Sequence, residues 1–332
     1  MVKAKTFPFL VADVGGTNAR FGLVTGTNLS SGCFIIEEQH VFDCAKYNSF
    51  ESVLGTYLGK INAGIIQSAC IAIAAPVTSD RIVLTNLSWE FSIEATKKKF
   101  NLANFEVIND FAAQAYATLH LIPANLKVLT AGTINLVAPR VIIGPGTGLG
   151  IAGLINMNGR WHSISGEGGH ISYAPTSAKE VEVLKALGVE HRHVSVENLL
   201  SGPGLIMLYT SLCEINGRTS QSYDAKDISA NAMLGNDADC VEALSLFCRI
   251  LGSTAGDAAL LFGAFGGVYL SGGILPKIED FLFKSDLVDS FQRKGVMRSL
   301  MESVPISLIT SDKPALFGAA HWFLEHGRIN CN

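Results

Sequence analysis

Charged residues are scarce in this sequence, and neither sign dominates. Lys, Arg, Asp and Glu make up 16% of the 332 residues, and the formal net charge is −4. This balance argues against nucleic-acid and membrane partners, because a protein that binds nucleic acid or an anionic membrane usually carries a basic patch. The hydrophobic content of 48% is typical of a well-packed globular chain. We expect two domains, because single cores seldom grow past about 250–300 residues.

The seven cysteines are scattered and include no CxxC pair. An odd, dispersed set argues against a disulfide framework or a zinc site and for a reducing compartment. The N-terminus reaches an acid, Asp13, too soon to hold a signal-peptide core. The run closest to a membrane span, Ile65–Val77, is too short and contains a proline. We therefore expect a cytoplasmic protein.

The chain is organised around Leu10–Val24, LVADVGGTNARFGLV. Two apolar runs flank a turn without bulk, which predicts strand, tight turn, strand. The candidate phosphate-binding residues are Asp13, Gly15, Gly16 and Thr17, since bare N–H groups in a turn form an anion nest and a nearby carboxylate suits Mg²⁺. The alternative is an ordinary surface hairpin.

A second stretch, Val141–Ile155, repeats this pattern as VIIGPGTGLGIAGLI. When Thr147 is aligned with Thr17, Gly146 falls on Gly16 and apolar residues flank both turns. This similarity indicates a degenerate internal duplication. Gly146, Thr147 and Gly148 would form a second phosphate-facing turn, and the two turns together would hold a polyphosphate.

A buried strand over Phe105–Ile108 is expected to deliver Asn109 and Asp110 to a helix over Phe111–Leu119. Both residue types are preferred helix N-caps, which is the structural interpretation. The functional interpretation is that Asp110 is a general base, because open α/β sheets bind ligands at the carboxyl ends of their strands. The two interpretations are compatible, since a helix N-terminus keeps a carboxylate ionised.

Three further segments contain polar residues or glycines that suit a ligand. In SISGEGGH, glycines flank Glu167 and let backbone approach a ligand; the alternative is a loop with solvated Glu167 and His170, and metal ligation by His170 is not expected. Glu197 is expected in the first turn of a helix that SGPG interrupts or ends. Gly272 and Gly273 end a strand, either as a simple turn or beside an adenine or ribose.

Apolar spacing and capping residues predict the other elements. The expected helices are Tyr47–Asn62, one beginning after Ser92, one capped by Ser177 and Glu180, Asp239–Phe262 and Ala315–His326. The expected strands are Phe34–Val41, Ile65–Ala75, Gly263–Leu275 and Pro305–Ile309.

Six segments in this order resemble the bacterial-type glucokinase family of the actin–hexokinase–Hsp70 ATPase superfamily. They are ADVGGTNAR at Ala12–Arg20, INDFAA at Ile108–Ala113, GPGTGLG at Gly144–Gly150, GEGGH at Gly166–His170, SVENLLSGPG at Ser195–Gly204 and FGGVYLSGGI at Phe265–Ile274. The resemblance implies a two-domain, actin-like α/β fold of the ribonuclease H-like kind with a cleft between the domains. The expected domains are a small α/β domain, 1–121 with 311–332, and a large α+β domain, 122–310.

The resemblance also implies an activity: transfer of the ATP γ-phosphoryl group to the 6-hydroxyl of D-glucose. By family analogy Asp110 is the catalytic base, and Asn109, Asp110, Glu167, His170 and Glu197 bind the sugar. The phosphates would lie against Asp13, Gly15, Gly16 and Thr17 and against Gly146, Thr147 and Gly148, with adenosine beside Gly272 and Gly273. Mg²⁺ is expected with ATP near Asp13, without tight protein ligands, and the family is often dimeric.

Some features depart from related patterns. Pro145 stands where an alanine is usual in the family and removes one N–H from the second turn. The clustered cysteines of the related repressor–kinase family are absent after His170. Two alternatives stay open: an Hsp70-type ATPase module that drives a partner, and a kinase for mannose, fructose or glucosamine.

Overall fold

The computed structural model describes residues 7–28, 33–61, 66–85, 87–133, 135–188 and 193–327. By internal contacts the chain divides into two units. Unit 1 comprises Met1–Ile122, Met157–Ser165 and Ser311–Asn332, and unit 2 comprises Pro123–Asn156 and Gly166–Thr310. Segment Met157–Ser165 of unit 1 lies inside the range expected for the large domain. The expected limits of the folding domains stay a prediction.

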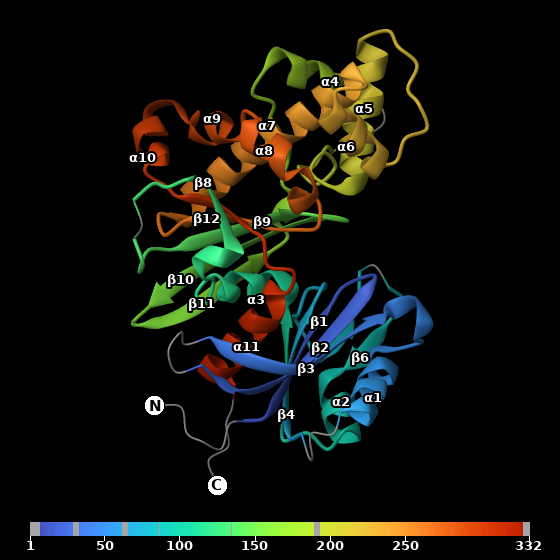
Figure 1. Cartoon of the computed structure of the whole chain (residues 1–332), viewed down its shortest axis with the longest axis vertical. Coiled ribbons are helices and arrows are strands. Elements are labelled where there is room, and N and C mark those ends of the chain that lie inside the picture. The colour runs from blue at the N-terminus through green and yellow to red at the C-terminus, as the bar shows by residue number, and fades with distance from the viewer. Residues whose placement is uncertain are drawn as a thin grey trace. The chain divides into compact units, whose positions relative to one another are not determined.

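Unit 1 is a five-stranded sheet with helices on both faces (Figure 1). The sheet order is β3-β2-β1-β4-β7, in which β1 pairs antiparallel with β2 and parallel with β4, and β4 pairs parallel with β7. Its elements are β1 (Phe9–Val14), β2 (Asn18–Thr27), β3 (Phe34–Asp43), the 3-10 helix η1 (Cys44–Lys46), α1 (Phe50–Lys60), β4 (Ser68–Ile73), β5 (Arg81–Val83), β6 (Glu90–Ser92), α2 (Ile93–Lys99), β7 (Asn104–Asn109), α3 (Asp110–Ala117) and α11 (Pro314–His326), and most of β11 (Arg160–Gly166) also belongs here.

Alternation along β1 explains the two layers of helices. Leu10 and Val14 pack with residues of α1, whereas Phe9 and Val11 pack with residues of α3 and α11. Successive strand residues point to opposite faces, so a strand buried on both sides must be apolar throughout. Asp13 shares the face of Val11 and is the one half-buried position in β1.

Unit 2 contains a second sheet, and its strands follow the order β10-β9-β12-β13-β8. An antiparallel β9–β10 hairpin is followed by parallel β12 and β13, as β4 and β7 follow the β1–β2 hairpin in unit 1. The duplication inferred from the two glycine turns therefore extends to the arrangement of the strands. The strands and 3-10 helices are η2 (Pro123–Asn125), β8 (Leu126–Thr130), β9 (Arg140–Pro145), β10 (Leu149–Met157), η3 (Gly168–His170), β12 (Val268–Leu270), η4 (Leu275–Ile278), η5 (Gly295–Met297) and β13 (Ile306–Ile309).

Seven α-helices of unit 2 lie within its described residues, and the longest forms the centre of its core. They are α4 (Ala178–Gly188), α5 (Gly202–Ile215), α6 (Ala225–Leu234), α7 (Ala238–Phe262), α8 (Glu279–Lys284), α9 (Leu287–Gln292) and α10 (Arg298–Glu302). By length and composition α7 would suffice to cross a membrane, contrary to the expectation that no such stretch occurs. However, 67% of its most apolar window is buried inside the fold, as in the core helix of a globular protein.

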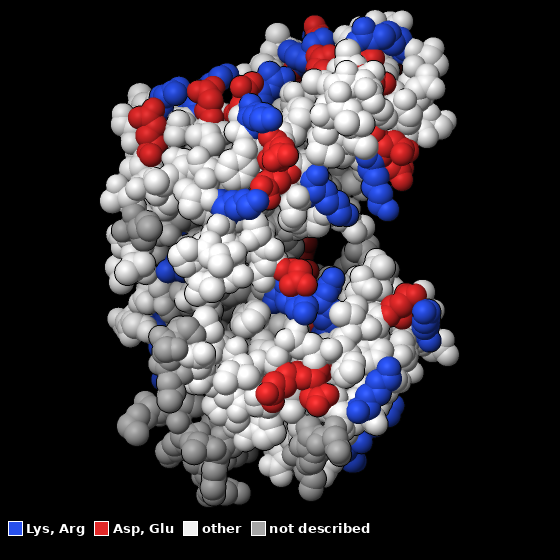
Figure 2. All heavy atoms as spheres, in the orientation of Figure 1, with Lys and Arg blue, Asp and Glu red and all other residues white. Residues whose placement is uncertain are grey.

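Lys and Arg are interspersed with Asp and Glu on the face that Figure 2 shows, with no continuous field of one sign. The six cysteines among the described residues are free thiols; Cys331 lies outside them. Except for the helix expected at Ser195, the expected helices and strands are present, with ends shifted by a few residues; the expected end residues Asn62 and Ile65 lie outside the described ranges. β12 is much shorter than the expected Gly263–Leu275 strand.

Candidate functional site

The first glycine turn joins β1 to β2 in unit 1. Asp13 and Arg20 are cross-strand partners, and Arg20 Nη1 lies 3.4 Å from Asp13 Oδ2. Burial raises the pKa of Asp13, and the charge and hydrogen bond of Arg20 lower it in part. Gly15 N–H donates to the Asn18 carbonyl at 3.0 Å, which closes the turn, and Thr17 is exposed at its tip.

Asp110 lies directly after β7, at the same end of the sheet as the turn between β1 and β2. Val14 of β1, Ile73 of β4 and Asn109 of β7 lie side by side in one row across the sheet. Gly15 and Asp110 each follow that row by one residue. Two strand spacings of about 4.8 Å separate β1 from β7, so the two backbones lie roughly 10 Å apart. The end of β4 lies between them: Ala74 N–H donates to the Val14 carbonyl at 3.0 Å, and Asn109 Nδ2 donates to the Ala75 carbonyl at 3.4 Å.

Asn109 and Asp110 were both candidates for the N-cap of α3, and Asn109 takes that role. Asn109 is the N-cap of α3, and its Oδ1 accepts from Ala112 N–H at 3.0 Å. Its amide donates to Asp110 Oδ1 at 3.1 Å, and Phe111 N–H donates to the same oxygen at 2.9 Å. These donors suit the charged form of a carboxylate.

The second glycine turn, between β9 and β10 in unit 2, is shorter than the first by one residue. Three residues lie between the paired Pro145 and Leu149, whereas four lie between Val14 and Ala19. Ala19 and Leu149 keep the offset of 130 residues that aligns Thr17 with Thr147, whereas Val14 and Pro145 differ by 131, so the extra residue of the first turn lies before Gly16. Thr147 is exposed at its turn tip, as Thr17 is.

Three of the six motifs contact this second hairpin, which carries a fourth. Gly202 N–H donates to the Gly146 carbonyl at 2.9 Å, and Ser271 N–H donates to that of Ile143 at 2.9 Å. A Cβ at Gly169 would lie 2.4 Å from the Leu149 carbonyl, so only glycine permits this approach. The structure thus brings GEGGH, SVENLLSGPG and SGGI against GPGTGLG.

Glu197 is the centre of that convergence. Its Oε2 accepts from Leu149 N–H at 2.7 Å, and its Oε1 lies 3.9 Å from His170 Nε2. A Cβ on Gly148 would meet Glu197 Oε2 at 2.5 Å. The Glu197 carboxylate therefore lies directly on the second glycine turn.

Glu167 and His170 lie on the exposed side of the same loop. His170 N–H donates to the Glu167 carbonyl at 3.0 Å, which folds GEGGH into a single 3-10 turn. Glu167, His170 and Glu197 are thus neighbours in unit 2, as Asn109 and Asp110 are in unit 1.

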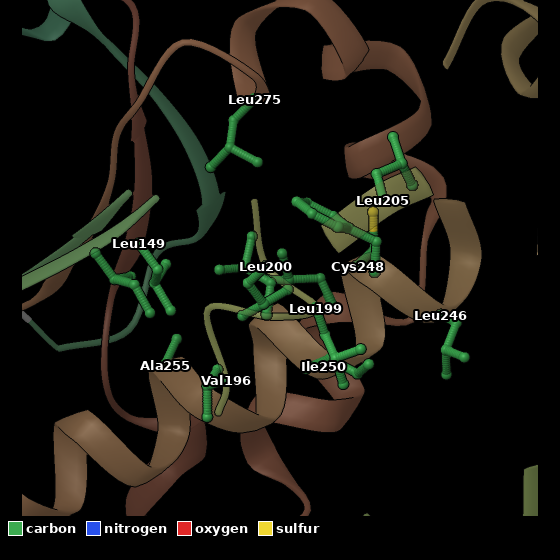
Figure 3. Close-up of a cluster of buried hydrophobic side chains, with 14 of the residues drawn as sticks. Leu149, Val196, Leu199, Leu200, Leu205, Leu246, Cys248, Ile250, Ala255 and Leu275 are labelled. Atoms are coloured by element: carbon green, nitrogen blue, oxygen red, sulfur yellow. The ribbon is translucent and has the colours of Figure 1, made fainter. Parts of the chain in front are cut away.

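The prediction that a helix begins at Ser195 is wrong. Ser195 N–H donates to Asn198 Oδ1 at 2.8 Å, and Val196 N–H donates to the Ile171 carbonyl at 3.0 Å, so this backbone forms a turn and a short ladder instead. The helix starts at SGPG, with Ser201 as the N-cap of α5. Side chains of Val196, Leu199 and Leu200 enter the core beside Ile250 and Ala255 of α7, which anchors the segment that carries Glu197 (Figure 3).

Gly272 and Gly273 differ in what surrounds them. Gly272 has φ +94°, and a Cβ there would meet the Pro145 carbonyl at 2.3 Å, so it packs against the second hairpin. Gly273 has no atom within 4 Å of such a Cβ and has open space beside it. Gly272 and Gly273 therefore lie beside the second glycine turn, which is a candidate phosphate-binding turn.

Two partners of the candidate site residues were not predicted from the sequence. Arg20 could have been found from hairpin symmetry, since opposite charges at matched positions across a turn pair with each other. The backbone N–H of Leu149 leaves no signal in sequence. No group of three or more His, Cys, Asp or Glu side chains that could hold a metal occurs within the described ranges.

Comparison with known proteins identifies relatives over almost the whole chain. The glucokinase family model matches residues 10–326. Glucokinase from Saccharophagus degradans is 43% identical over 316 residues, which cover 95% of this chain and 98% of that protein. Glucokinase from Chromobacterium violaceum is 39% identical, covering 97% and 91%.

Solved structures agree with this. The crystal structure of glucokinase from an Antarctic psychrotroph superposes with a TM-score of 0.88 at 41% identity, covering 95% of this chain and 98% of that one. A ROK family glucokinase from Streptomyces griseus, solved with glucose and AMPPNP, has a TM-score of 0.60 at 18% identity, covering 94% and 98%. This second likeness shows the fold alone.

Proposed function

Because this chain belongs to the glucokinase family, we propose that it transfers the γ-phosphoryl group of ATP to the 6-hydroxyl of D-glucose. The observation that carries the proposal is the pairing of a glycine turn with a carboxylate site in each unit. In unit 1 Asp110 follows the same sheet edge as Gly15, and in unit 2 Glu197 lies on the Gly146–Gly148 turn.

In this mechanism Asp110 takes the proton of the sugar hydroxyl as the oxygen attacks the γ-phosphorus, and the bond from that phosphorus to the β,γ-bridging oxygen breaks, so that ADP leaves. Phosphoryl transfer needs mainly positioning and charge stabilisation, so one base and fixed donors suffice. Asn109, Glu167, His170 and Glu197 orient the sugar. An analogue without one hydroxyl would leave one of these polar groups unpaired, which would give the site its selectivity.

The ATP phosphates would lie against Asp13, Gly15, Gly16 and Thr17 and against Gly146, Thr147 and Gly148, with adenosine beside Gly272 and Gly273. One carboxylate and one exposed hydroxyl, Asp13 and Thr17, fit Mg²⁺, which is usually bound through substrate phosphates and water with few protein ligands. When bound, Mg²⁺ neutralises charge on the phosphoryl oxygens.

Glucose-dependent release of ADP tests the proposal. We expect ADP formation from Mg-ATP to require glucose and to stop with EDTA. An Hsp70-type ATPase would release ADP without any sugar. Initial rates with glucose, mannose, fructose and glucosamine identify the preferred acceptor, and a higher kcat/KM for another sugar would replace glucose in the proposal.

Two further parts belong to the same proposal. Water must be kept from the γ-phosphate, so we propose that the two units form the two domains of an actin-like fold and close over the sugar. The homodimer and the cytoplasmic location stay predictions, which size-exclusion chromatography and cell fractionation would test.

A further inference from the structure

Cys44 lies directly under the first glycine turn, at the end of β3. It is 1% exposed and begins η1, immediately after Asp43, which pairs with Asn18 of β2. Its backbone N–H donates to the Thr17 carbonyl at 2.9 Å, and its Sγ donates to the Gly15 carbonyl at 3.6 Å. One residue thus contacts two carbonyls of the turn Gly15–Thr17.

These contacts orient the peptide groups of the turn. A peptide unit is planar and trans, so its N–H points away from its C=O. With the Gly15 carbonyl directed at Cys44, the Gly16 N–H points to the opposite side of the turn. That is the direction in which an anion nest presents its donors.

The thiol can serve as this donor because it stays protonated. Burial raises the pKa of Cys44, and the charge of Asp43 raises it further. A second buried thiol, Cys70 on β4, is in register with Val11 and Glu106, away from the turn, and its pKa is raised by burial too. Cys70 therefore provides a matched control.

We propose that Cys44 is a positioning residue that directs the Gly16 N–H toward a phosphate of ATP. This inference rests on the proposed function of the turn and adds a residue that no motif of the turn contains. Its side chain touches no substrate. It acts by holding the Gly15 peptide in one orientation.

Cys44→Ala and Cys44→Ser test this, because both leave nearly the same empty volume and only serine keeps a hydrogen-bond donor. For Cys44→Ala we expect KM for ATP to rise about 2- to 10-fold, the range for one lost hydrogen bond, with KM for glucose unchanged. Cys44→Ser should stay closer to the unaltered chain. Cys70→Ala should leave both constants unchanged.

Equal KM values for ATP in Cys44→Ala and Cys44→Ser would overturn the proposal, as would equal rises in both KM values. The increase in Tm at saturating Mg-ATP gives a readout that is independent of turnover, and it should be smaller for Cys44→Ala than for Cys70→Ala. If the unaltered chain binds ATP but does not phosphorylate glucose, the proposed function fails while the Tm comparison still decides on Cys44. If Cys44→Ala does not fold, Cys44→Val, which fills the space without a donor, takes its place in the comparison.

Discussion

Glu197 accepts a hydrogen bond from the backbone N–H of Leu149 at 2.7 Å, so a carboxylate proposed to bind the sugar is held on the second glycine turn. The two roles proposed for unit 2, sugar binding and phosphate binding, are therefore coupled. A change in the turn displaces the carboxylate, and a change in the carboxylate frees the turn.

Gly148→Ala should weaken glucose binding without any change in a sugar-binding side chain. The added Cβ would lie 2.5 Å from Glu197 Oε2, so the carboxylate must move off the Leu149 N–H. We expect KM for glucose to rise at least about 10-fold, which corresponds to one lost hydrogen bond to a charged group. Gly188→Ala, at a position in the same unit with nothing within 4 Å, is the control and should leave KM unchanged.

Glu197→Gln should also raise KM for glucose, through loss of charge. The amide oxygen can still accept from Leu149 N–H, but the NH₂ group removes the negative charge beside His170. Steady-state kinetics and glucose binding measured by calorimetry would show the effect. Glu182→Gln, on α4, is the control, and a normal affinity in Glu197→Gln would contradict the role given to Glu197.

Asp110→Asn should abolish most turnover and spare much of the glucose affinity. Loss of a general base costs about 10²- to 10⁴-fold in rate. Asparagine keeps an oxygen that can accept from Phe111 N–H, so α3 should begin as before. Asp224→Asn, at the N-cap of α6, is the matched control, because asparagine caps helices as well as aspartate. A kcat within a few-fold of normal would remove Asp110 as the base.

Gly272→Ala should destabilise unit 2. Alanine is strained at φ +94°, and its Cβ would meet the Pro145 carbonyl at 2.3 Å. We expect the free energy of unfolding to fall by about 2–4 kcal/mol. Gly273→Ala, with open space beside it, should change it by less than about 0.5 kcal/mol. Urea denaturation of both variants measures the difference, and equal stabilities would show that the backbone relaxes there.

Stability should fall in mild acid through a buried histidine of unit 1. Burial, and then the neighbouring His321, lower the pKa of His120 to about 4. His120 Nε2 contacts His321 Nδ1, and His321 Nε2 lies 3.0 Å from Glu325 Oε2. Between pH 6.5 and 4 the unfolded chain binds a proton at His120 that the folded chain does not, so the free energy of unfolding decreases as pH falls.

The slope from this one group is at most about 1.4 kcal/mol per pH unit. Urea denaturation at pH 7.5 and pH 5.0 should therefore show a loss that is about 1–2 kcal/mol smaller in His120→Gln than in the unaltered chain. Identical losses in the two proteins would show that His120 does not titrate in this range. Carboxylates with lowered pKa values, such as Asp239, contribute equally to both proteins and cancel in the comparison.

Many of the helices, strands and turns could be predicted from local sequence patterns. The glycine turns between apolar runs predicted both hairpins, and Ser92 and Asn109 marked helix starts, because turn chemistry and capping depend on a few adjacent residues. The six motifs in order indicated the family. The helix predicted at Ser195 does not form because backbone groups of Val194 and Val196 bond to Tyr173 and Ile171, which are distant in sequence.

Only the tertiary structure decided how the candidate residues meet. The register of β1, β4 and β7 puts Gly15 and Asp110 after one row, and packing on α7 sets Glu197 against Leu149 N–H. Cys44 carries no recognisable motif, yet it contacts two carbonyls of the first turn. Such relations depend on strand pairing and core packing between segments far apart in the chain, whereas the turns and caps depend on neighbours that the sequence itself displays.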